Sequence, residues 1–176
     1  MNKINSIPFP LLTTDRLILR QLTLEDDNEI FLLRSDSEVN KYLDRPISKT
    51  VDDARQFTNK INDSISKNEL IFWAVCFKEN PKLIGTICLW NISEDTTTAE
   101  IDFELLPDYQ GKGIMQEVLP IAIKYGFETM KLNSIEGEVD PNNLKSIKLM
   151  ERNGFIFDKR LKNTEIYSVQ NPNIKK

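Results

Sequence analysis

The chain has 176 residues, which suits one domain with a single well-packed core. It is 40% hydrophobic and 28% charged, a composition that excludes a disordered or fibrous protein. The net charge of -4 argues against a nucleic-acid binder, because neutralising phosphates requires a basic surplus on at least one face. We expect one domain over residues 1–176, with no nucleic-acid partner.

The sequence contains no histidine. This excludes His-based triads, His metal sites and His acid/base chemistry, so we expect no metal, and proton transfer must use carboxylates, tyrosine, lysine, serine or water. Cys76 and Cys88 both lie inside apolar runs. They are predicted to be buried small hydrophobic residues rather than a disulfide or a reactive thiol.

The sequence also shows no sign of export or membrane insertion. The segment Met1 to Pro8 lacks the apolar core of a signal peptide, and no apolar run approaches the ~18 residues of a membrane span. We therefore expect a cytoplasmic protein with no membrane partner.

The first part of the chain predicts one strand and two helices. Residues Arg16 to Arg20 alternate in the manner of a strand, and Thr23 to Asp26 is a capping-box sequence that predicts a helix through about Leu33. A second helix is predicted from Thr50, with an apolar stripe at helical spacing. The stripe consists of Ala54, Phe57, Ile61 and Ile65.

Three apolar runs follow, and the short polar segments between them predict an antiparallel meander. The runs are Leu70 to Phe77, Leu83 to Trp90 and Ala99 to Leu106. From Ile114 the apolar residues keep the spacing of a long helix, and Ser134 to Val139 is predicted to be a strand. A strand, a helix and a strand in this order predict a right-handed crossover between parallel strands.

The last part of the chain predicts a short helix and two strands. Pro141 to Asn143 is typical of a helix start, and Asn153 followed by Gly154 is typical of a helix end. Strands are predicted at Phe155 to Phe157 and at Ile166 to Val169. The expected architecture is one mixed α/β domain with helices on both faces of a central sheet.

The main chemical signal is the loop Tyr109 to Met115, between a predicted strand and the long helix. Unpaired N–H groups and the positive end of the helix dipole favour an anion there, and glycines let a phosphate approach the backbone. Taken alone, the loop is equally consistent with a tight turn whose glycines serve backbone shape. A P-loop is excluded by Leu106 and by Gly113 after Lys112, and a dinucleotide fingerprint is excluded by Gln116.

The segment Gln110 to Met115 is similar to the Gln/Arg-x-x-Gly-x-Gly/Ala pyrophosphate loop of the GNAT acetyltransferase superfamily, with Met115 replacing the last small residue. The similarity covers about residues 13–158 and extends to the branch typified by ribosomal-protein N-terminal acetyltransferases of the RimJ/RimL type. Further matching segments occur in family order: Thr14 to Arg20, Lys41 to Leu43, Leu83 to Ile87, Ala99 to Ile101, Asn143 to Ser146 and Leu149 to Phe155.

The resemblance implies a GNAT fold, whose mixed and mostly antiparallel sheet is splayed between the fourth and fifth strands, here Ala99 to Leu106 and Ser134 to Val139. It implies an acetyl-CoA-dependent N-acetyltransferase that acts on a primary amine, either a peptide N-terminus or a small molecule. Backbone amides of the loop would hold the pyrophosphate, and the strand around Glu104 would pair with the pantetheine arm. The implied acetyl-CoA-binding residues are Phe103, Leu105, Gln110, Gly111, Lys112, Gly113, Ile114, Met115, Asn143 and Ser146.

The implied catalytic groups are Glu100, Glu104 and Ser146. Glu100 resembles the family position that often acts as general base, and Glu104 lies on the same face of the strand. We favour Glu100, although each carboxylate is equally consistent with a solvent-facing or ion-paired residue. Ser146 resembles a serine that protonates the leaving thiolate, a role that water can also fill. Met150 stands where many relatives have a tyrosine acid.

Other points stay open at the level of sequence. Asn143 can be a plain helix cap as well as a pantetheine ligand, and Lys112, Lys145 and Lys148 can reach CoA phosphates or simply be exposed. An alternative function is a non-catalytic module that senses acyl-CoA, which Met150 and the lack of histidine make conceivable. The family includes dimers, so a homodimer is an open option, and the acceptor amine is not identified.

Overall fold

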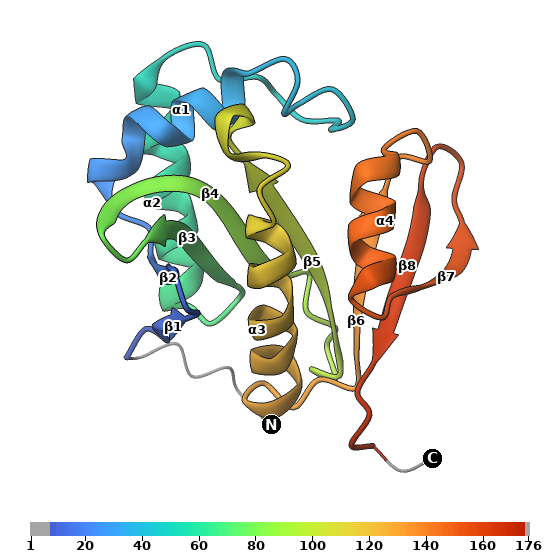
Figure 1. The fold of residues 1–176 in the computed structure, drawn as a ribbon. Coiled ribbons are helices and arrows are strands. Elements are labelled where there is room, and N and C mark those ends of the chain that lie inside the picture. The colour runs from blue at the N-terminus through green and yellow to red at the C-terminus, as the bar shows by residue number, and fades with distance from the viewer. Residues whose placement is uncertain (1–7, 175–176) are drawn as a thin grey trace.

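The computed structural model describes residues 8–174. In it, eight strands form one sheet in the order β1-β2-β3-β4-β5-β6-β8-β7 (Figure 1). The segment 1–7, where the sequence indicates no signal peptide, lies outside the described residues. Between residues 8 and 174 no helix is long and apolar enough to cross a bilayer. The strands are β1 (Leu12–Thr13), β2 (Leu17–Gln21), β3 (Ile71–Phe77), β4 (Asn80–Trp90), β5 (Thr98–Leu105), β6 (Ser134–Val139), β7 (Ile156–Arg160) and β8 (Glu165–Gln170); the α-helices are α1 (Asp27–Ser35), α2 (Val51–Ser66), α3 (Ile114–Glu128) and α4 (Leu144–Arg152).

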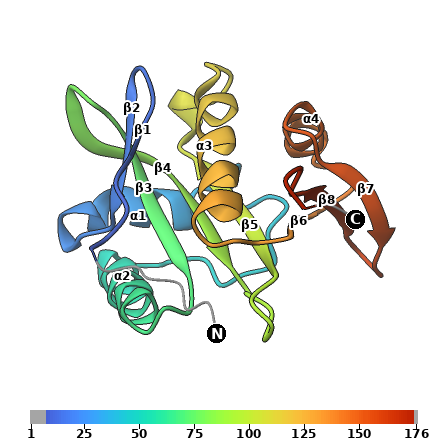
Figure 2. The same cartoon turned by 90° about the horizontal axis from the view of Figure 1, so that it is seen from below.

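The sheet changes character at β5 and β6. All other neighbouring strands pair antiparallel, whereas β5 and β6 pair parallel, as predicted for strands on either side of a long helix. Their ladder joins only Thr98–Glu100 of β5 to residues 134–136 of β6. Beyond it the two strands diverge, which Figures 1 and 2 show as an open angle between the N-terminal and C-terminal parts of the sheet. The predicted mixed sheet with a splay between these strands is confirmed.

Helices cover both faces of the sheet, as predicted (Figure 2). On one face, α3 and α4 enclose an apolar cluster that includes Ile101, Val118 and Met150. On the other, α1 and α2 enclose a second cluster that includes Ile30 and Phe72. Because side chains alternate along a strand, β5 buries Ala99, Ile101 and Leu105 toward α3 and turns its carboxylates to the α1 and α2 side.

Most predicted boundaries agree with the structure. Thr50 caps α2, accepting a hydrogen bond from the Asp53 N–H in a capping box, and Cys76 and Cys88 are buried free thiols. The capping box at Thr23 is also present, but its first turn is a 3-10 helix, Leu24–Asp26, and α1 follows from Asp27. Strand β1 was not predicted, because two residues carry no periodicity.

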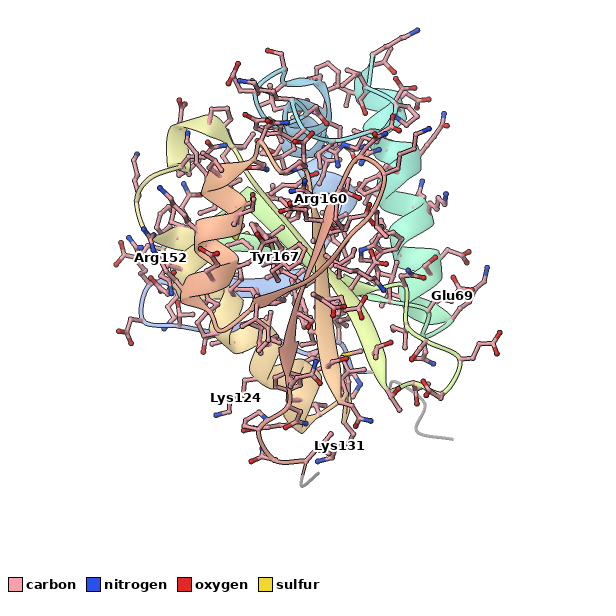
Figure 3. All side chains as sticks on the ribbon, turned by 90° about the vertical axis from the view of Figure 1, so that its right-hand side faces the viewer. Glu69, Lys124, Lys131, Arg152, Arg160 and Tyr167 are labelled. Carbon is pink, nitrogen blue, oxygen red and sulfur yellow. The ribbon has the colours of Figure 1, made fainter. Side chains whose placement is uncertain are left out.

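The β7 and β8 strands close the C-terminal end of the sheet as a hairpin. Arg160 forms an ion pair with Glu165 across it, and the rings of Phe157 and Tyr167 pack edge to face with centroids 5.8 Å apart. Figure 3 labels Arg160 and Tyr167 on this hairpin. Every residue of β7 is exposed. Strand β7 is therefore held in place mainly by its pairing with β8 rather than by burial of its own side chains.

Gly85 on β4 allows the close approach of β5. A Cβ at this position would lie 2.4 Å from the Glu104 carbonyl oxygen and 2.8 Å from Leu105 Cδ1. The first of these is backbone in a neighbouring strand, so it cannot move without disturbing the β4–β5 ladder.

Gly85→Ala should therefore lower the free energy of unfolding by about 1–3 kcal/mol, as expected for overpacking in a tight core. Urea denaturation measures the change. Gly126→Ala in α3 is the control, since its Cβ would meet side-chain ends such as Ile135 Cδ1 at 2.8 Å and alanine favours the helix by about 1 kcal/mol. Equal losses in the two variants would contradict the role of the β4–β5 approach.

Candidate functional site

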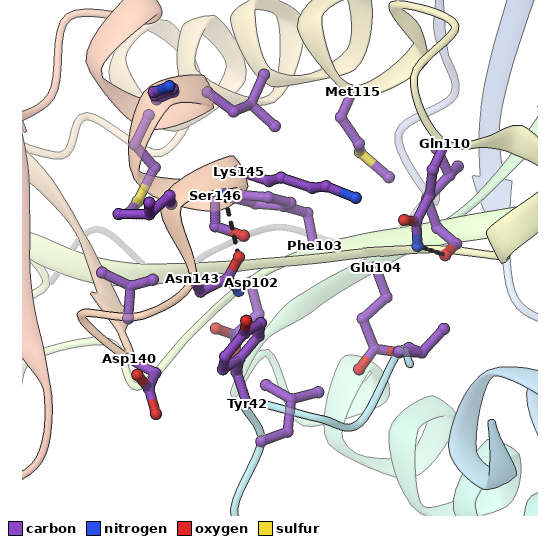
Figure 4. A pocket seen from close by; sticks show the side chains of 18 of the residues that line it. Tyr42, Asp102, Phe103, Glu104, Gln110, Met115, Asp140, Asn143, Lys145 and Ser146 are labelled. Atoms are coloured by element: carbon purple, nitrogen blue, oxygen red, sulfur yellow. Dashed lines mark hydrogen bonds between the residues drawn. The ribbon is translucent and has the colours of Figure 1, made fainter. Parts of the chain in front are cut away.

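A cavity of about 790 Å³ opens where β5 and β6 separate (Figure 4). Its walls come from β5, the loop before α3, the end of β6, the start of α4, and the segment between α1 and α2 that contains Lys41, Tyr42 and Leu43. This volume lies in the range of cavities that bind cofactors and small ligands. Segments far apart in the sequence thus meet at the splay in the sheet.

The loop before α3 exposes backbone N–H groups to this cavity. Gly111 and Gly113 have φ of 71° and 73°, a left-handed conformation that strongly favours glycine. Gly113 is the N-cap of α3 and offers no side chain to accept hydrogen bonds from the first turn. A Cβ on Gly111 would meet nothing within 4 Å, so the outer side of the loop is open to a ligand. The backbone shape of this loop is compatible with an anion at the N-terminus of α3.

Arg16, just before β2, holds the loop before α3 through a hydrogen bond to its backbone. Its Nη2 donates to the Lys112 carbonyl oxygen at 2.9 Å, and its Nε contacts Glu117 Oε2 at 2.6 Å. A trans peptide points its C=O and its N–H in opposite directions, so the bond to Lys112 turns the Gly113 N–H away from Arg16. Desolvation opposes ionisation of Glu117, but hydrogen bonds from Thr14 and Arg16 outweigh it, and the pKa of Glu117 lies below its usual value.

Gln110 and Lys112 use their side chains within the loop region. The Gln110 amide donates from Nε2 to the Leu105 carbonyl oxygen at 3.0 Å, which ties the base of the loop to the end of β5 (Figure 4). Lys112 Nζ lies 5.7 Å from the centre of the Tyr109 ring, and Lys112 is not among the described residues that line the cavity. Lys145 and Lys148 do line it.

The three acidic residues of β5 differ in their surroundings. Glu100 accepts a hydrogen bond from Asn91 and lies outside the described lining of the cavity; burial raises its pKa, as do Glu138 and Glu136, while Asn91 lowers it. Glu104 lines the cavity and forms an ion pair with Arg45. Of the two predicted carboxylates, the structure therefore brings only Glu104 to the cavity wall.

Asp102 lies between these two residues and also lines the cavity. Its side chain is exposed, yet it faces the cavity, where protein walls limit the surrounding water. This desolvation, with the negative charges of Glu100 and Glu104, raises the pKa of Asp102 to about 6, against the smaller opposing effects of Trp90 and Arg45. Sequence reasoning missed Asp102, although strand alternation places it on the same face as Glu100 and Glu104.

Asn143 and Ser146 reach the cavity from the first turn of α4. Asn143 Oδ1 accepts the Ser146 N–H at 3.2 Å, so Asn143 is a helix cap and its side-chain amino group remains able to donate to a ligand. In Figure 4, Asn143, Ser146 and Asp102 gather on one side of the view, with Gln110 and Met115 on the other. Met150 also lines the cavity. Its sulfur packs against Gly137, where an added Cβ would lie only 2.6 Å from that sulfur.

Comparison with known proteins gives consistent matches. The acetyltransferase (GNAT) domain model matches residues 16–156. The uncharacterized N-acetyltransferase p20 of Bacillus licheniformis is 35% identical, over 82% of this chain and 81% of the relative.

Solved structures show the same fold. An acetyltransferase (GNAT family) from Bacillus anthracis superimposes with a TM-score of 0.81 at 26% identity, covering 92% of this chain and 99% of that one. A spermidine N-acetyltransferase from Vibrio cholerae, in complex with CoA and spermine, superimposes with a TM-score of 0.80 at 23% identity, covering 90% and 97%. Together with the splayed sheet and the glycine loop, these matches show that the chain belongs to the GNAT acetyltransferase domain family and is an acetyl-transferring enzyme.

Proposed function

We propose that the protein is an N-acetyltransferase that uses acetyl-CoA and transfers the acetyl group directly to a primary amine. The observation that carries the proposal is that one cavity connects a glycine loop at the N-terminus of α3 with carboxylates on β5, through the gap between β5 and β6. The CoA-bound neighbour from Vibrio cholerae shares this fold, which supports a CoA cosubstrate. Its spermine supports an amine acceptor.

The cavity residues suit acetyl-CoA in three respects. Backbone amides from Gln110 to Met115 hold the pyrophosphate, with the positive end of the α3 dipole behind them. The β6 side of residues 101–105, including Phe103 and Leu105, has no strand partner in the described chain and can pair with the pantetheine amides. Asn143 donates to the same arm, and Lys145 and Lys148 face the phosphates.

The chain's own groups then supply proton transfer. Acetyl-CoA provides an activated thioester, and transfer forms an amide N–C bond while the C–S bond breaks. Asp102, which faces the cavity, takes the proton of the ammonium group directly or through water, with Glu104 or Glu100 as the alternative bases predicted from sequence. The thiolate takes a proton from Ser146 or from water, because Met150 has none to give. The second proton that the acylated nitrogen loses replaces the proton which that donor gave to sulfur.

The proposal also covers the acceptor, the oligomeric state and the cellular location. The RimJ/RimL-type resemblance favours peptide N-termini as acceptors, whereas the spermine bound to the Vibrio cholerae neighbour favours small-molecule amines. The homodimer and the cytoplasmic location expected from sequence stay predictions.

Titration calorimetry with acetyl-CoA should give binding with a Kd between about 1 μM and 1 mM, the range in which the KM values of most enzymes lie. A thiol-release assay over N-terminal peptides, amino acids and polyamines should show turnover on at least one amine. The absence of acetyl-CoA binding would refute the proposal, and binding without any turnover would favour the acyl-CoA sensor.

Arg16→Met should raise the Kd for acetyl-CoA by about threefold to tenfold, since a loop without the Arg16 hydrogen bond must be ordered on binding. Kinetics with acetyl-pantetheine, which lacks the pyrophosphate, should change little. Arg55→Met is the control, because Arg55 pairs with Asp27 at 2.8 Å on the far helices and is similarly exposed. An equal effect on both acetyl donors would assign Arg16 a general structural role instead.

Asp102→Asn should reduce kcat by about 10² to 10⁴-fold while acetyl-CoA binding is retained. In the native protein the base must be ionised, so kcat/KM should rise as the pH increases through about 6, the pKa of Asp102. The variant should lose this rising limb. Glu100→Gln is the matched comparison: if it removes the limb while Asp102→Asn keeps it, Glu100 is the base.

A further inference from the structure

A second cavity, of about 220 Å³, lies on the opposite face of the sheet from α3. Its walls are mainly apolar and include Ile30 of α1, Phe57 and Ile61 of α2, and Phe72 of β3. Phe57 and Phe72 pack edge to face with ring centroids 5.9 Å apart. The volume is below the range of pockets for drug-sized ligands, so the cavity suits a compact group.

The two cavities meet at β5. Asp102, Phe103 and Glu104 line both of them. A compact group seated in the second cavity would therefore present an attached amine at Asp102, beside the route proposed for the thioester. This connection makes the second cavity the natural place for the acceptor's body.

Four charged residues line the second cavity: Arg34, Arg45, Asp102 and Glu104. Glu104 pairs with Arg45, which neutralises both. Arg45 and Glu104 are electrostatic neighbours of both Asp102 and Arg34. With that pair neutralised, the charges left in the cavity wall are a negative one at Asp102 and a positive one at Arg34.

Arg34 has no ion-pair partner of its own in the described chain. Arg34 stacks on Phe57 at 4.0 Å from the guanidinium carbon to the ring centre, and no described carboxylate lies within ion-pair distance of it. Burial and the nearby Arg45 lower the pKa of Arg34 and outweigh the opposing effect of Glu104, so the cation lies in an unfavourable environment. The Nη2 atom of Arg45 is also buried without a hydrogen-bond partner. A ligand anion beside Arg34 and Arg45 would neutralise the first and give the second a hydrogen-bond acceptor.

We infer that the acceptor is a small amphoteric amine, such as an apolar α-amino acid, whose ammonium group meets Asp102, whose apolar side chain fills the second cavity and whose carboxylate meets Arg34. The inference rests on the proposed function, because it takes the Asp102 side as the point of transfer. It disfavours polyamines, whose second ammonium group would face Arg34 and Arg45.

Ligand-detected NMR measures binding without requiring turnover. Leucine, leucinamide and spermidine should be compared in the presence of CoA, because leucinamide keeps the side chain and the α-amine of leucine but has a neutral amide in place of the carboxylate. Leucine should bind about tenfold to a hundredfold more tightly than leucinamide, as expected for a charge-assisted hydrogen bond, and spermidine should bind more weakly than either.

Arg34→Met should remove the preference for leucine over leucinamide while leaving the affinity for leucinamide nearly unchanged. Arg55→Met removes a guanidinium from the neighbouring helix, outside the cavity, and should retain the preference. Equal binding of leucine and leucinamide to the native protein, tighter binding of spermidine, or no binding of either apolar amine would overturn the inference. Failure of acetyl-CoA to bind would instead overturn the proposed function.

Discussion

The short parallel ladder between β5 and β6 is the feature on which the site depends. The ladder stops at Glu100, while β5 runs on to Leu105 and β6 to Val139. Backbone N–H and C=O groups in a sheet need partners, so the unpaired side of residues 101–105 favours an extended ligand that can hydrogen-bond like a strand. The same divergence brings the start of α4 and the loop before α3 to opposite walls of one cavity.

The two faces of β5 then serve different purposes. Ala99, Ile101 and Leu105 fasten the strand to the apolar cluster under α3, which makes β5 a rigid support. The intervening carboxylates point to the face that α1 and α2 cover only in part, where the second cavity lies. Because Gly85 lets β4 approach closely, the position of these carboxylates is fixed by backbone packing rather than by the side chains themselves.

Local patterns in the sequence were sufficient for most of the fold. The apolar stripe of α2, its start at Thr50 and the glycine loop are each encoded within a few neighbouring residues. The structure confirms the helix and its start, and it shows the two loop glycines in the left-handed conformation. Contacts between distant segments carry no such local signal. The bond from Arg16 to Lys112 spans 96 positions, and the pairing of Glu104 with Arg45 joins β5 to a loop of irregular structure. For this reason sequence reasoning ranked Glu100 and Glu104 without knowing which one Arg45 neutralises, and it passed over Asp102.

The distribution of charge explains how an acidic protein can hold an anionic cosubstrate. The chain has a net charge of -4, yet Lys41, Lys145, Lys148 and Arg152 all line the main cavity. Asp102 and Glu104 line the part of that cavity which continues into the second one. Glu38, Glu138 and Asp140 also line the main cavity, so its lining is mixed in charge. The basic side chains of α4 attract phosphates only locally, beside the loop before α3, while the carboxylates of β5 attract an ammonium group. Net charge alone would have argued against a phosphate ligand, because it averages over groups whose signs differ from place to place.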